Sequence, residues 1–329
     1  MAQWTFASVN IEQAQGLHTV NYINELFQKE RSIQIARIPL NDTVLIVSDK
    51  FTLADKRKVA LRCISKGYNR FPLCVALMIP KQGTTLNYGV SSLKADPTKI
   101  IMEYLRWMVA SPFSTGSLSL NDNEWRRLLI MSIGSGLLSE FFHEKFEKTR
   151  VTAIELDEDI ADASRKYFGL RKDAFNSTFT MNEVNRNKSR LLKGNYFDAL
   201  LLDVCSSRPQ LIWCPIEKLQ TVRNIALLKS LLKENGTLVV HITSAFHPRD
   251  ETIYPLVMEK VEKIIKIYEK NFNFCARKDI ATTDIILTCT DKIQGNFSRK
   301  IEDAFEKLGF ARGEICLNRQ FSPLTRNIR

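Results

Sequence analysis

Apolar runs and amphipathic segments alternate along most of the chain. The runs RLLIMSIG, VTAIEL, STFTMN, FDALLLDV, GTLVVHIT, NFCARK and DIILTCT are short and bounded by turn residues, which is typical of strands. Helical periodicity begins near Leu137, Glu158, Glu217, Tyr254 and Asn296. This alternation predicts an α/β fold with a doubly wound, seven-stranded, mostly parallel sheet. The last two runs are too close for a crossover helix, so we expect a hairpin with one antiparallel edge strand.

The first 95 residues have a less regular pattern. A helix is predicted around His18 to Glu30, and DTVLIVSD and FPLCVALMIP are predicted strands. Residues 96–111, DPTKIIMEYLRWMVAS, open with an Asp-Pro start signal and carry apolar residues at helical spacing, so a helix is predicted there. We therefore expect two domains, a smaller N-terminal α+β region of residues 1–95 and a large domain of residues 96–329.

Positive charge is concentrated in the N-terminal region. The chain has a net charge of +11, and residues 1–95 hold 12 Lys+Arg against 6 Asp+Glu. Lys58, Arg62, Lys66 and Arg70 recur every four residues, so in a helix they would form one stripe. Such a stripe suits an acidic protein surface or RNA phosphates, although a solvated helix face is the more common explanation.

Several classes of protein are disfavoured by the composition. No apolar run approaches the roughly 18 residues of a membrane span, and the first residues lack the features of a secretory signal, so we expect a cytoplasmic protein with no membrane partner. The seven cysteines include no C-x-x-C pair, and the four histidines show no ligand spacing. We expect reduced core thiols and no metal site.

The first predicted β-α-β unit carries the residues that indicate a nucleotide-binding site. Gly134-Ser135-Gly136 follows a strand that ends at Ile133, and a turn of small residues lets backbone N–H groups approach a ligand. Glu155 ends the next strand, where an acidic side chain accepts hydrogen bonds from ribose hydroxyls. Asp203 ends a further strand beside the expected topological switch point. A nicotinamide dehydrogenase would share this order, but Ser139 stands where its third glycine would fall.

Four segments carry a resemblance to a known family: LLIMSIGSGLLSEFFHEKF, VTAIELDEDIADASRKYFG, FDALLLDVCSSRPQLIWCP and LLKENGTLVVHI. They resemble the class I S-adenosylmethionine-dependent methyltransferases, in particular the spermidine-synthase-like domain of the methyltransferase-like thirteen family, which methylates a lysine of elongation factor 1A. With the segment 96–111, the resemblance covers about residues 96–310. It implies a Rossmann-like methyltransferase fold and S-adenosyl-L-methionine as the cofactor.

The resemblance also implies site residues. Those expected to bind the cofactor are Gly134, Ser135, Gly136, Glu155, Leu156, Asn182, Glu183, Asp203 and Val204. Asp203 is expected to be the catalytic residue that orients the acceptor, and Ser206 and Ser207 are expected at the mouth of the acceptor pocket. Ser132 and Ser135 stand where the family usually has glycine, and a serine there requires an ordinary backbone conformation. Asn182 replaces an acidic residue but can still hydrogen-bond adenine.

These features predict S-adenosylmethionine-dependent methylation of a protein lysine, with an elongation factor 1A-like substrate, and they leave RNA open as a partner. One alternative is a catalytically inactive methyltransferase-like scaffold, which the departures at Ser132 and Asn182 and the basic stretch 186–193 favour. A polyamine aminopropyltransferase ranks third, because a polycationic substrate needs an acidic pocket and Arg208 follows the expected site.

Overall fold

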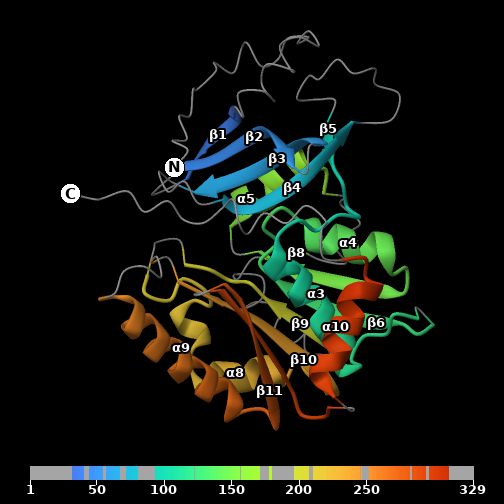
Figure 1. The fold of residues 1–329 in the computed structure, drawn as a ribbon, viewed down its shortest axis with the longest axis vertical. Helices are drawn as coiled ribbons and strands as arrows, with labels where there is room; N and C mark the ends of the chain where they lie inside the picture. Colours follow the sequence, from blue (N-terminus) through green and yellow to red (C-terminus); the bar gives the residue numbers. More distant parts are fainter. Residues whose placement is uncertain are drawn as a thin grey trace. The chain divides into compact units, whose positions relative to one another are not determined.

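The structure is a computed structural model that describes residues 32–40, 44–54, 57–66, 72–80, 93–121, 123–155, 157–170, 178–179, 196–206, 210–244, 246, 252–281, 284–293 and 296–310. The chain divides into two compact units (Figure 1). The first consists of residues 1–101, 133–141 and 157–172, and the second of residues 102–132, 142–156 and 173–329. Each unit has its own sheet.

The first unit contains an antiparallel sheet whose five strands follow the order of the chain. They are β1 (Ser32–Pro39), β2 (Val44–Ala54), β3 (Arg57–Lys66), β4 (Pro72–Pro80) and β5 (Leu93–Ala95). Alternate residues of these strands are buried, as in Leu45 and Val47, because successive side chains of a strand point to opposite faces. Ala163 and Phe168, from the helical segments α5 (Glu158–Ala163) and η2 (Ser164–Phe168), join the same apolar core.

The basic residues of the N-terminal region do not form a helical stripe. Lys58, Arg62 and Lys66 lie on the strand β3, so the condition of a helix is not met for them, and Arg70 lies outside the described residues. Arg62 is buried, and its guanidinium donates to the two carboxylate oxygens of Asp49 at 2.7 and 2.8 Å. Burial raises the pKa of Asp49, and the hydrogen bonds from Arg62 offset only part of that effect. Arg62 therefore holds the sheet together and is not available to an acidic partner.

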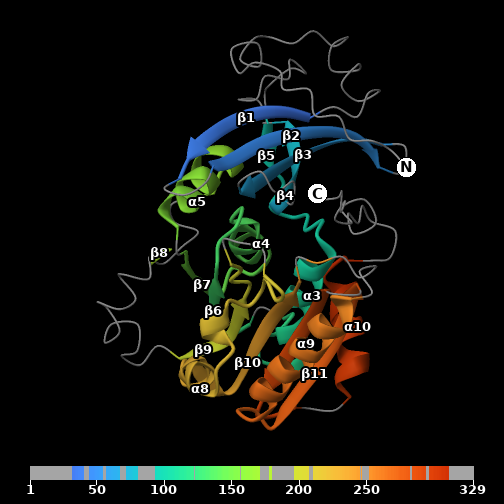
Figure 2. The ribbon, with the colours of Figure 1, turned by 90° about the vertical axis from the view of Figure 1, so that its left-hand side faces the viewer.

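The second unit contains a mixed sheet of the doubly wound type (Figure 2). Its strand order is β11-β12-β10-β9-β6-β7-β8, with strands β6 (Arg126–Met131), β7 (Thr149–Ile154), β8 (Thr178–Phe179), β9 (Phe197–Leu202), β10 (Leu232–Thr243), β11 (Phe274–Ala281) and β12 (Asp284–Thr290). Strands β6 to β10 pair in parallel, whereas β12 is antiparallel to both of its neighbours. The expected hairpin is present, but its antiparallel strand lies between β10 and β11 and not at the edge.

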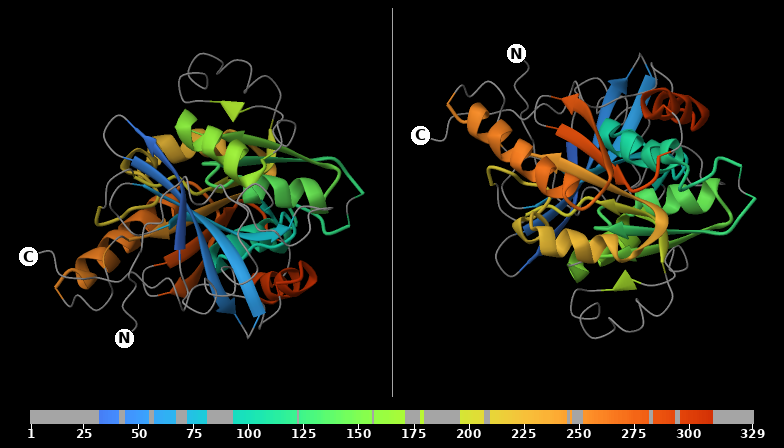
Figure 3. Two further views of the ribbon diagram at one scale, coloured as in Figure 1. Left: turned by 90° about the horizontal axis from the view of Figure 1, so that it is seen from above. Right: turned by 90° about the horizontal axis from the view of Figure 1, so that it is seen from below.

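Helices cover both faces of this second sheet, and Figure 3 shows them on either side of the strands. The pair α8 (Val222–Lys229) and α9 (Tyr254–Glu269) covers one face, and α3 (Glu103–Thr115) and α10 (Phe297–Lys307) cover the other. Helix α9 buries Val257, Val261, Ile264, Ile265 and Tyr268, a spacing of three and four residues that places one face against the core.

Two helices begin later than the sequence predicted. Helix α3 begins at Glu103, because the carboxylate of Asp96 accepts hydrogen bonds from the backbone N–H and hydroxyl of Thr98 and closes a turn there. In place of one helix at Glu217, a short 3-10 segment η3 (Glu217–Leu219) precedes α8, which the side chain of Thr221 caps. Helix α4 (Leu137–Lys145) begins at the expected residue.

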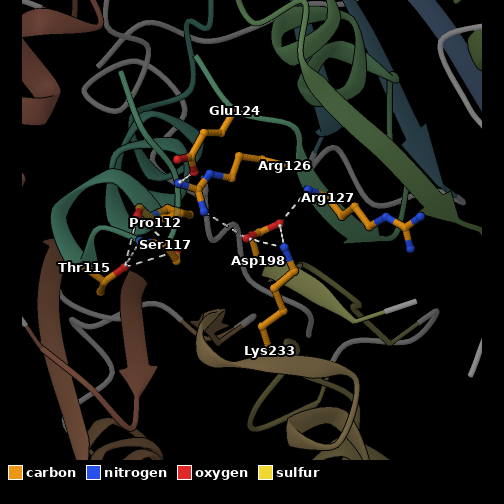
Figure 4. A network of polar contacts seen from close by, with 8 residues as sticks. All are labelled: Pro112, Thr115, Ser117, Glu124, Arg126, Arg127, Asp198 and Lys233. Atoms are coloured by element: carbon orange, nitrogen blue, oxygen red, sulfur yellow. Dashed lines mark hydrogen bonds and ion pairs between the residues drawn. The ribbon is translucent and has the colours of Figure 1, made fainter. Parts of the chain in front are cut away.

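A buried carboxylate ties together the amino ends of three neighbouring strands in the second sheet (Figure 4). Asp198 accepts hydrogen bonds from the Arg126 side chain at 3.3 Å, from the backbone N–H of Arg127 at 2.8 Å and from the Lys233 ammonium at 2.9 Å. A cavity of about 230 Å³ is lined by these side chains at the same edge. Because ligands of such sheets bind at the carboxyl ends of the strands, we assign this cluster a structural role.

Candidate functional site

Three predicted residues lie at the carboxyl edge of the second sheet. Strands β6 and β7 pair up to Met131 and Ile154, so Ser132 and Glu155 follow their strands side by side. The hydroxyl of Ser132 lies 3.5 Å from the Glu155 carboxylate, and the backbone N–H of Asp203 donates to the carbonyl of Met131 at 3.1 Å. The structure therefore brings Glu155 and Asp203 to the carboxyl ends of β7 and β9, the two strands that flank β6, at the edge that ligands occupy in this fold.

Ser132 adopts a backbone conformation that serine rarely takes. Its φ is +76°, and it is the one non-glycine residue with positive φ in the described part of the chain. A serine at this position was expected to require an ordinary backbone conformation, and Ser132 does not meet that condition. In this left-handed region the Cβ atom approaches the backbone at a cost of about 1–2 kcal/mol. The backbone at Ser132 therefore has the left-handed conformation that favours glycine, which is the residue usual at this position in the family that the sequence resembles.

The small-residue turn that follows belongs to the first unit. Gly134 and Gly136 have φ values of +56° and +78°, so both need the freedom of glycine. The Gly136 N–H donates to the carbonyl of Ile133 at 2.8 Å, and the hydroxyl of Ser164 donates to the carbonyl of Gly134. Ser135 is buried between them with φ outside the positive region. The sequence thus identified a real tight turn before α4.

Asp203 is the centre of a polar cluster within the second unit. One carboxylate oxygen, Oδ1, lies 2.6 Å from Nδ1 of His241 on β10, and the other, Oδ2, accepts a hydrogen bond from the Tyr104 hydroxyl at 3.2 Å. Nε2 of His241 lies 2.5 Å from the carboxylate of Asp284 on β12. The Tyr104 and His241 rings stack with centroids 4.2 Å apart. Both Asp203 oxygens are therefore held in fixed directions.

The charge of His241 follows from its two acidic neighbours. Burial by itself lowers the pKa of this imidazole, but the carboxylates of Asp203 and Asp284 outweigh that effect and raise it to about 10. His241 is 5% exposed, so these interactions are poorly screened by solvent. At neutral pH the cluster is a carboxylate–imidazolium–carboxylate group with one net negative charge.

A disulfide closes the loop that follows Asp203. Cys205 is joined to Cys214, and a second disulfide joins Cys275 to Cys289 across β11 and β12. The expectation that the cysteines are reduced core thiols was therefore wrong for these four. Cys205 and Cys214 meet within one loop, and Cys275 and Cys289 meet on paired strands, and cysteine spacing alone reveals neither pairing.

Val204, predicted to bind the cofactor, and Ser206, predicted at the mouth of the acceptor pocket, lie in or next to this loop. Val204 is buried, and its carbonyl accepts a hydrogen bond from the Ile216 N–H at 3.0 Å. The backbone N–H of Ser206 donates to the Trp213 carbonyl at 2.9 Å, and the Trp213 indole donates back to the Ser206 carbonyl at 2.6 Å. The predicted residues Leu156, Asn182, Glu183 and Ser207 lie outside the described residues.

Sequence reasoning missed three members of the Asp203 cluster: Tyr104, His241 and Asp284. They come from α3, β10 and β12, and neither spacing nor composition links these segments. The sequence could have pointed to His241 by its position, because it lies near the carboxyl end of a predicted buried strand. A polar residue there in a doubly wound sheet is a candidate for the ligand edge.

Comparison with known proteins identifies the class of fold. No family model matches the chain. The structure is similar to human methyltransferase-like protein 13 in complex with SAH, with a TM-score of 0.53, 20% identity and coverage of 64% of this chain and 94% of that one. It is also similar to a probable spermidine synthase from Corynebacterium glutamicum, with a TM-score of 0.57, 15% identity and coverage of 84% and 88%. The second unit thus has a Rossmann-like methyltransferase fold.

Curated relatives give a more particular likeness. The chain is 24% identical over 141 residues to the eEF1A lysine and N-terminal methyltransferase homolog of Drosophila melanogaster, covering 42% of this chain and 20% of that protein. It is 28% identical over 123 residues to the eEF1A lysine and N-terminal methyltransferase of Xenopus laevis, covering 35% and 17%. The chain therefore spans about a fifth of the length of these relatives. None of its described helices is long and apolar enough to cross a bilayer.

Proposed function

We propose that this chain is an S-adenosylmethionine-dependent methyltransferase that modifies a lysine of a protein, with an elongation factor 1A-like acceptor. The observation that carries the proposal is the placement of Glu155 and Asp203 at the carboxyl ends of β7 and β9, the parallel strands that flank β6 in a methyltransferase-like sheet. The similarity to eEF1A lysine methyltransferases supports a protein lysine as the acceptor. RNA remains the alternative acceptor that the experiment below distinguishes.

The residues present fit an adenosyl cofactor. Glu155 is 4% exposed, and a buried carboxylate at the end of the second strand is the group that binds ribose hydroxyls in nucleotide-binding sheets. In the turn after β6, Gly134 and Gly136 have no side chains and positive φ values, which is typical of turns that bring the backbone close to a ligand. In our proposal Glu155 and Gly134–Gly136 hold the cofactor, together with Leu156, Asn182, Glu183 and Val204.

Asp203 has the role of orienting the acceptor amine. When bound, S-adenosylmethionine supplies a methyl group attached to a sulfonium. The leaving group of the transfer is a neutral thioether, so no acid is needed to protonate it. A lysine has a pKa of about 10.4 in water and must lose a proton before it attacks. Asp203, held by His241 and Tyr104, accepts a hydrogen bond from that amine and fixes its direction, with Ser206 and Ser207 at the entrance. A fixed carboxylate positions the nitrogen better than a mobile one.

Two measurements test the proposal in sequence. Thermal denaturation with and without S-adenosylmethionine comes first, and we expect a higher midpoint for the wild type and a smaller rise for Glu155→Gln, because the cofactor binds the native state. Incubation with labelled cofactor and a eukaryotic lysate follows, with Asp203→Ala as the control. Label in one protein band that resists RNase and is lost in the variant supports the proposal. Label in RNA, or a midpoint unmoved at millimolar cofactor, contradicts it.

Aminopropyl transfer is the second candidate, because the likeness to the probable spermidine synthase covers more of this chain than the likeness to the methyltransferase does. A polyamine acceptor requires uncompensated acidic groups. Here the imidazolium of His241 offsets part of the charge of Asp203 and Asp284. Incubation with decarboxylated S-adenosylmethionine and putrescine, followed by polyamine chromatography, distinguishes the two reactions. A spermidine product would reverse our ranking.

A further inference from the structure

The loop after β9 and the neighbouring strand β10 bring four metal-ligating side chains together. One ligand atom from each of Asp203, Cys205, Cys214 and His241 lies within 4.8 Å of every other, and this is the one such group among the described residues. The set contains two sulfurs, one imidazole nitrogen and one carboxylate oxygen. Tetrahedral sites with these donor types are typical of zinc in proteins.

The surroundings of His241 match those of a zinc-bound histidine. A histidine that binds metal through one ring nitrogen usually donates its other N–H to a carboxylate, which fixes the ring. His241 presents Nδ1 to Asp203 at 2.6 Å, and its Nε2 lies 2.5 Å from the Asp284 carboxylate. Asp284 therefore occupies the supporting position of a metal site, outside the four ligands.

Burial and geometry favour a closed site. Cys214 and His241 are buried, and Cys205 and Asp203 are half-buried. The Cys205 sulfur lies 3.8 Å from Oδ1 of Asp203. Around a zinc ion with Zn–S bonds of about 2.3 Å, two thiolates lie roughly 3.8 Å apart, so the two sulfurs must separate from bonding distance. Rotation of the half-buried Cys205 side chain supplies that movement without displacing Cys214.

We propose that, when the Cys205–Cys214 disulfide is reduced, the two thiolates bind one Zn²⁺ ion together with Nδ1 of His241 and Oδ1 of Asp203. Reduction by a phosphine adds two electrons and two protons across the S–S bond, and the phosphine becomes its oxide with oxygen from water. Zinc binding then releases both thiol protons and the proton on Nδ1. Asp203 keeps Oδ2, which accepts from Tyr104, on the side away from the metal.

The second disulfide provides a matched control. Cys275 and Cys289 are partners on the paired strands β11 and β12, whereas Cys205 and Cys214 lie in the loop after β9. No histidine and carboxylate complete a ligand group with Cys275 and Cys289 in the described part of the chain. Replacing Cys275 and Cys289 removes the same number of sulfurs from the same unit of the chain. The Cys275→Ser/Cys289→Ser variant should therefore bind zinc as the wild type does.

The experiment uses the full chain, reduced with a phosphine, stripped with a chelator and titrated with Zn²⁺ against a chromophoric competitor. We expect one tight site per chain in the wild type and in the control, and loss of that site in Cys205→Ser, Cys214→Ser and His241→Asn. Asp284→Asn should bind about 10–100-fold more weakly. Co²⁺ in place of Zn²⁺ should give a thiolate-to-metal absorption band that Cys205→Ser lacks. Equal zinc binding by the wild type and the Cys205→Ser/Cys214→Ser variant would overturn the proposal.

A measurement on the wild type covers the case in which a variant fails to fold. Zinc should protect Cys205 and Cys214 from alkylation in the reduced chain, as read by peptide mass spectrometry, while the alkylation of Cys275 and Cys289 stays unchanged. Equal alkylation of Cys205 and Cys214 with and without zinc would also overturn the proposal. Neither readout depends on methyltransferase activity, so failure here and failure of the proposed function are distinguishable.

Discussion

The strained backbone of Ser132, at the end of β6, leads to an unusual prediction: glycine should give a more stable protein than alanine at this position. At an ordinary position, glycine is less stable than alanine by about 0.4–1 kcal/mol, because glycine loses more conformational freedom on folding. At Ser132, with φ at +76°, the left-handed conformation costs any residue with a Cβ atom about 1–2 kcal/mol. Relief of this cost exceeds the entropy loss, so Ser132→Gly should be more stable than Ser132→Ala by about 0.5–1 kcal/mol.

The alanine variant isolates the backbone effect. Both substitutions remove the hydroxyl that lies 3.5 Å from the Glu155 carboxylate, so its loss cancels in the comparison. Ser135, three residues on and with φ outside the positive region, provides the control. There the order should reverse, with Ser135→Ala more stable than Ser135→Gly. Equilibrium unfolding in urea measures all four variants, provided that the slope is unchanged. A glycine variant at 132 that is less stable than its alanine counterpart would refute the strain.

Three further predictions concern stability and are measured by urea unfolding. Asp198→Ala leaves the side chains of Arg126 and Lys233 without their carboxylate and should cost about 3–5 kcal/mol, whereas Lys233→Ala, at a half-exposed partner, should cost under about 1 kcal/mol. Similar losses in the two variants would contradict the role given to the carboxylate. Asp49→Asn removes the counter-charge of a buried guanidinium and should also cost about 3–5 kcal/mol, and a loss under about 1 kcal/mol would show that water reaches the pair. Gly136→Ala places a methyl group 2.4 Å from a leucine carbon at φ +78°, so it should destabilise more than Gly169→Ala, which has φ +77° and open space; equal effects would mean that the leucine moves aside freely.

Much of the second sheet could be predicted from sequence, because its central strands are continuous apolar runs. Buried parallel strands such as FDALLLDV need no polar face, so their pattern is unmistakable. Strand β3, RKVALRCISK, mixes charges with apolar residues at a spacing that also fits a helix, and the buried pairing of Arg62 with Asp49 explains how a strand accommodates that charge. The pairing of a buried charge depends on a contact between two strands, and the local sequence pattern does not predict that contact.

The site was predictable where it follows strand order and not where it depends on contacts between distant segments. Glu155 and Asp203 were found because acidic residues at strand ends have a defined place in this fold. His241 and Asp284 come from strands whose adjacency arises from a hairpin inserted beside β10. The position of β12 inside the sheet was also missed. The short link between β11 and β12 predicts a hairpin, but it does not say which of the two strands pairs with β10.

The N-terminal sheet completes its apolar core with Ala163 and Phe168, which the ribosome adds some seventy residues after β5. During synthesis, part of the apolar face of that sheet therefore stays exposed until Ala163 and Phe168 have left the ribosome. A gene fragment that stops after β5 would leave the same face open to water and to other chains. Expression of the N-terminal region alone should therefore lead to aggregation. A fragment that ends at residue 172 would carry β6 and β7 without the rest of their sheet, so the chain is best kept whole.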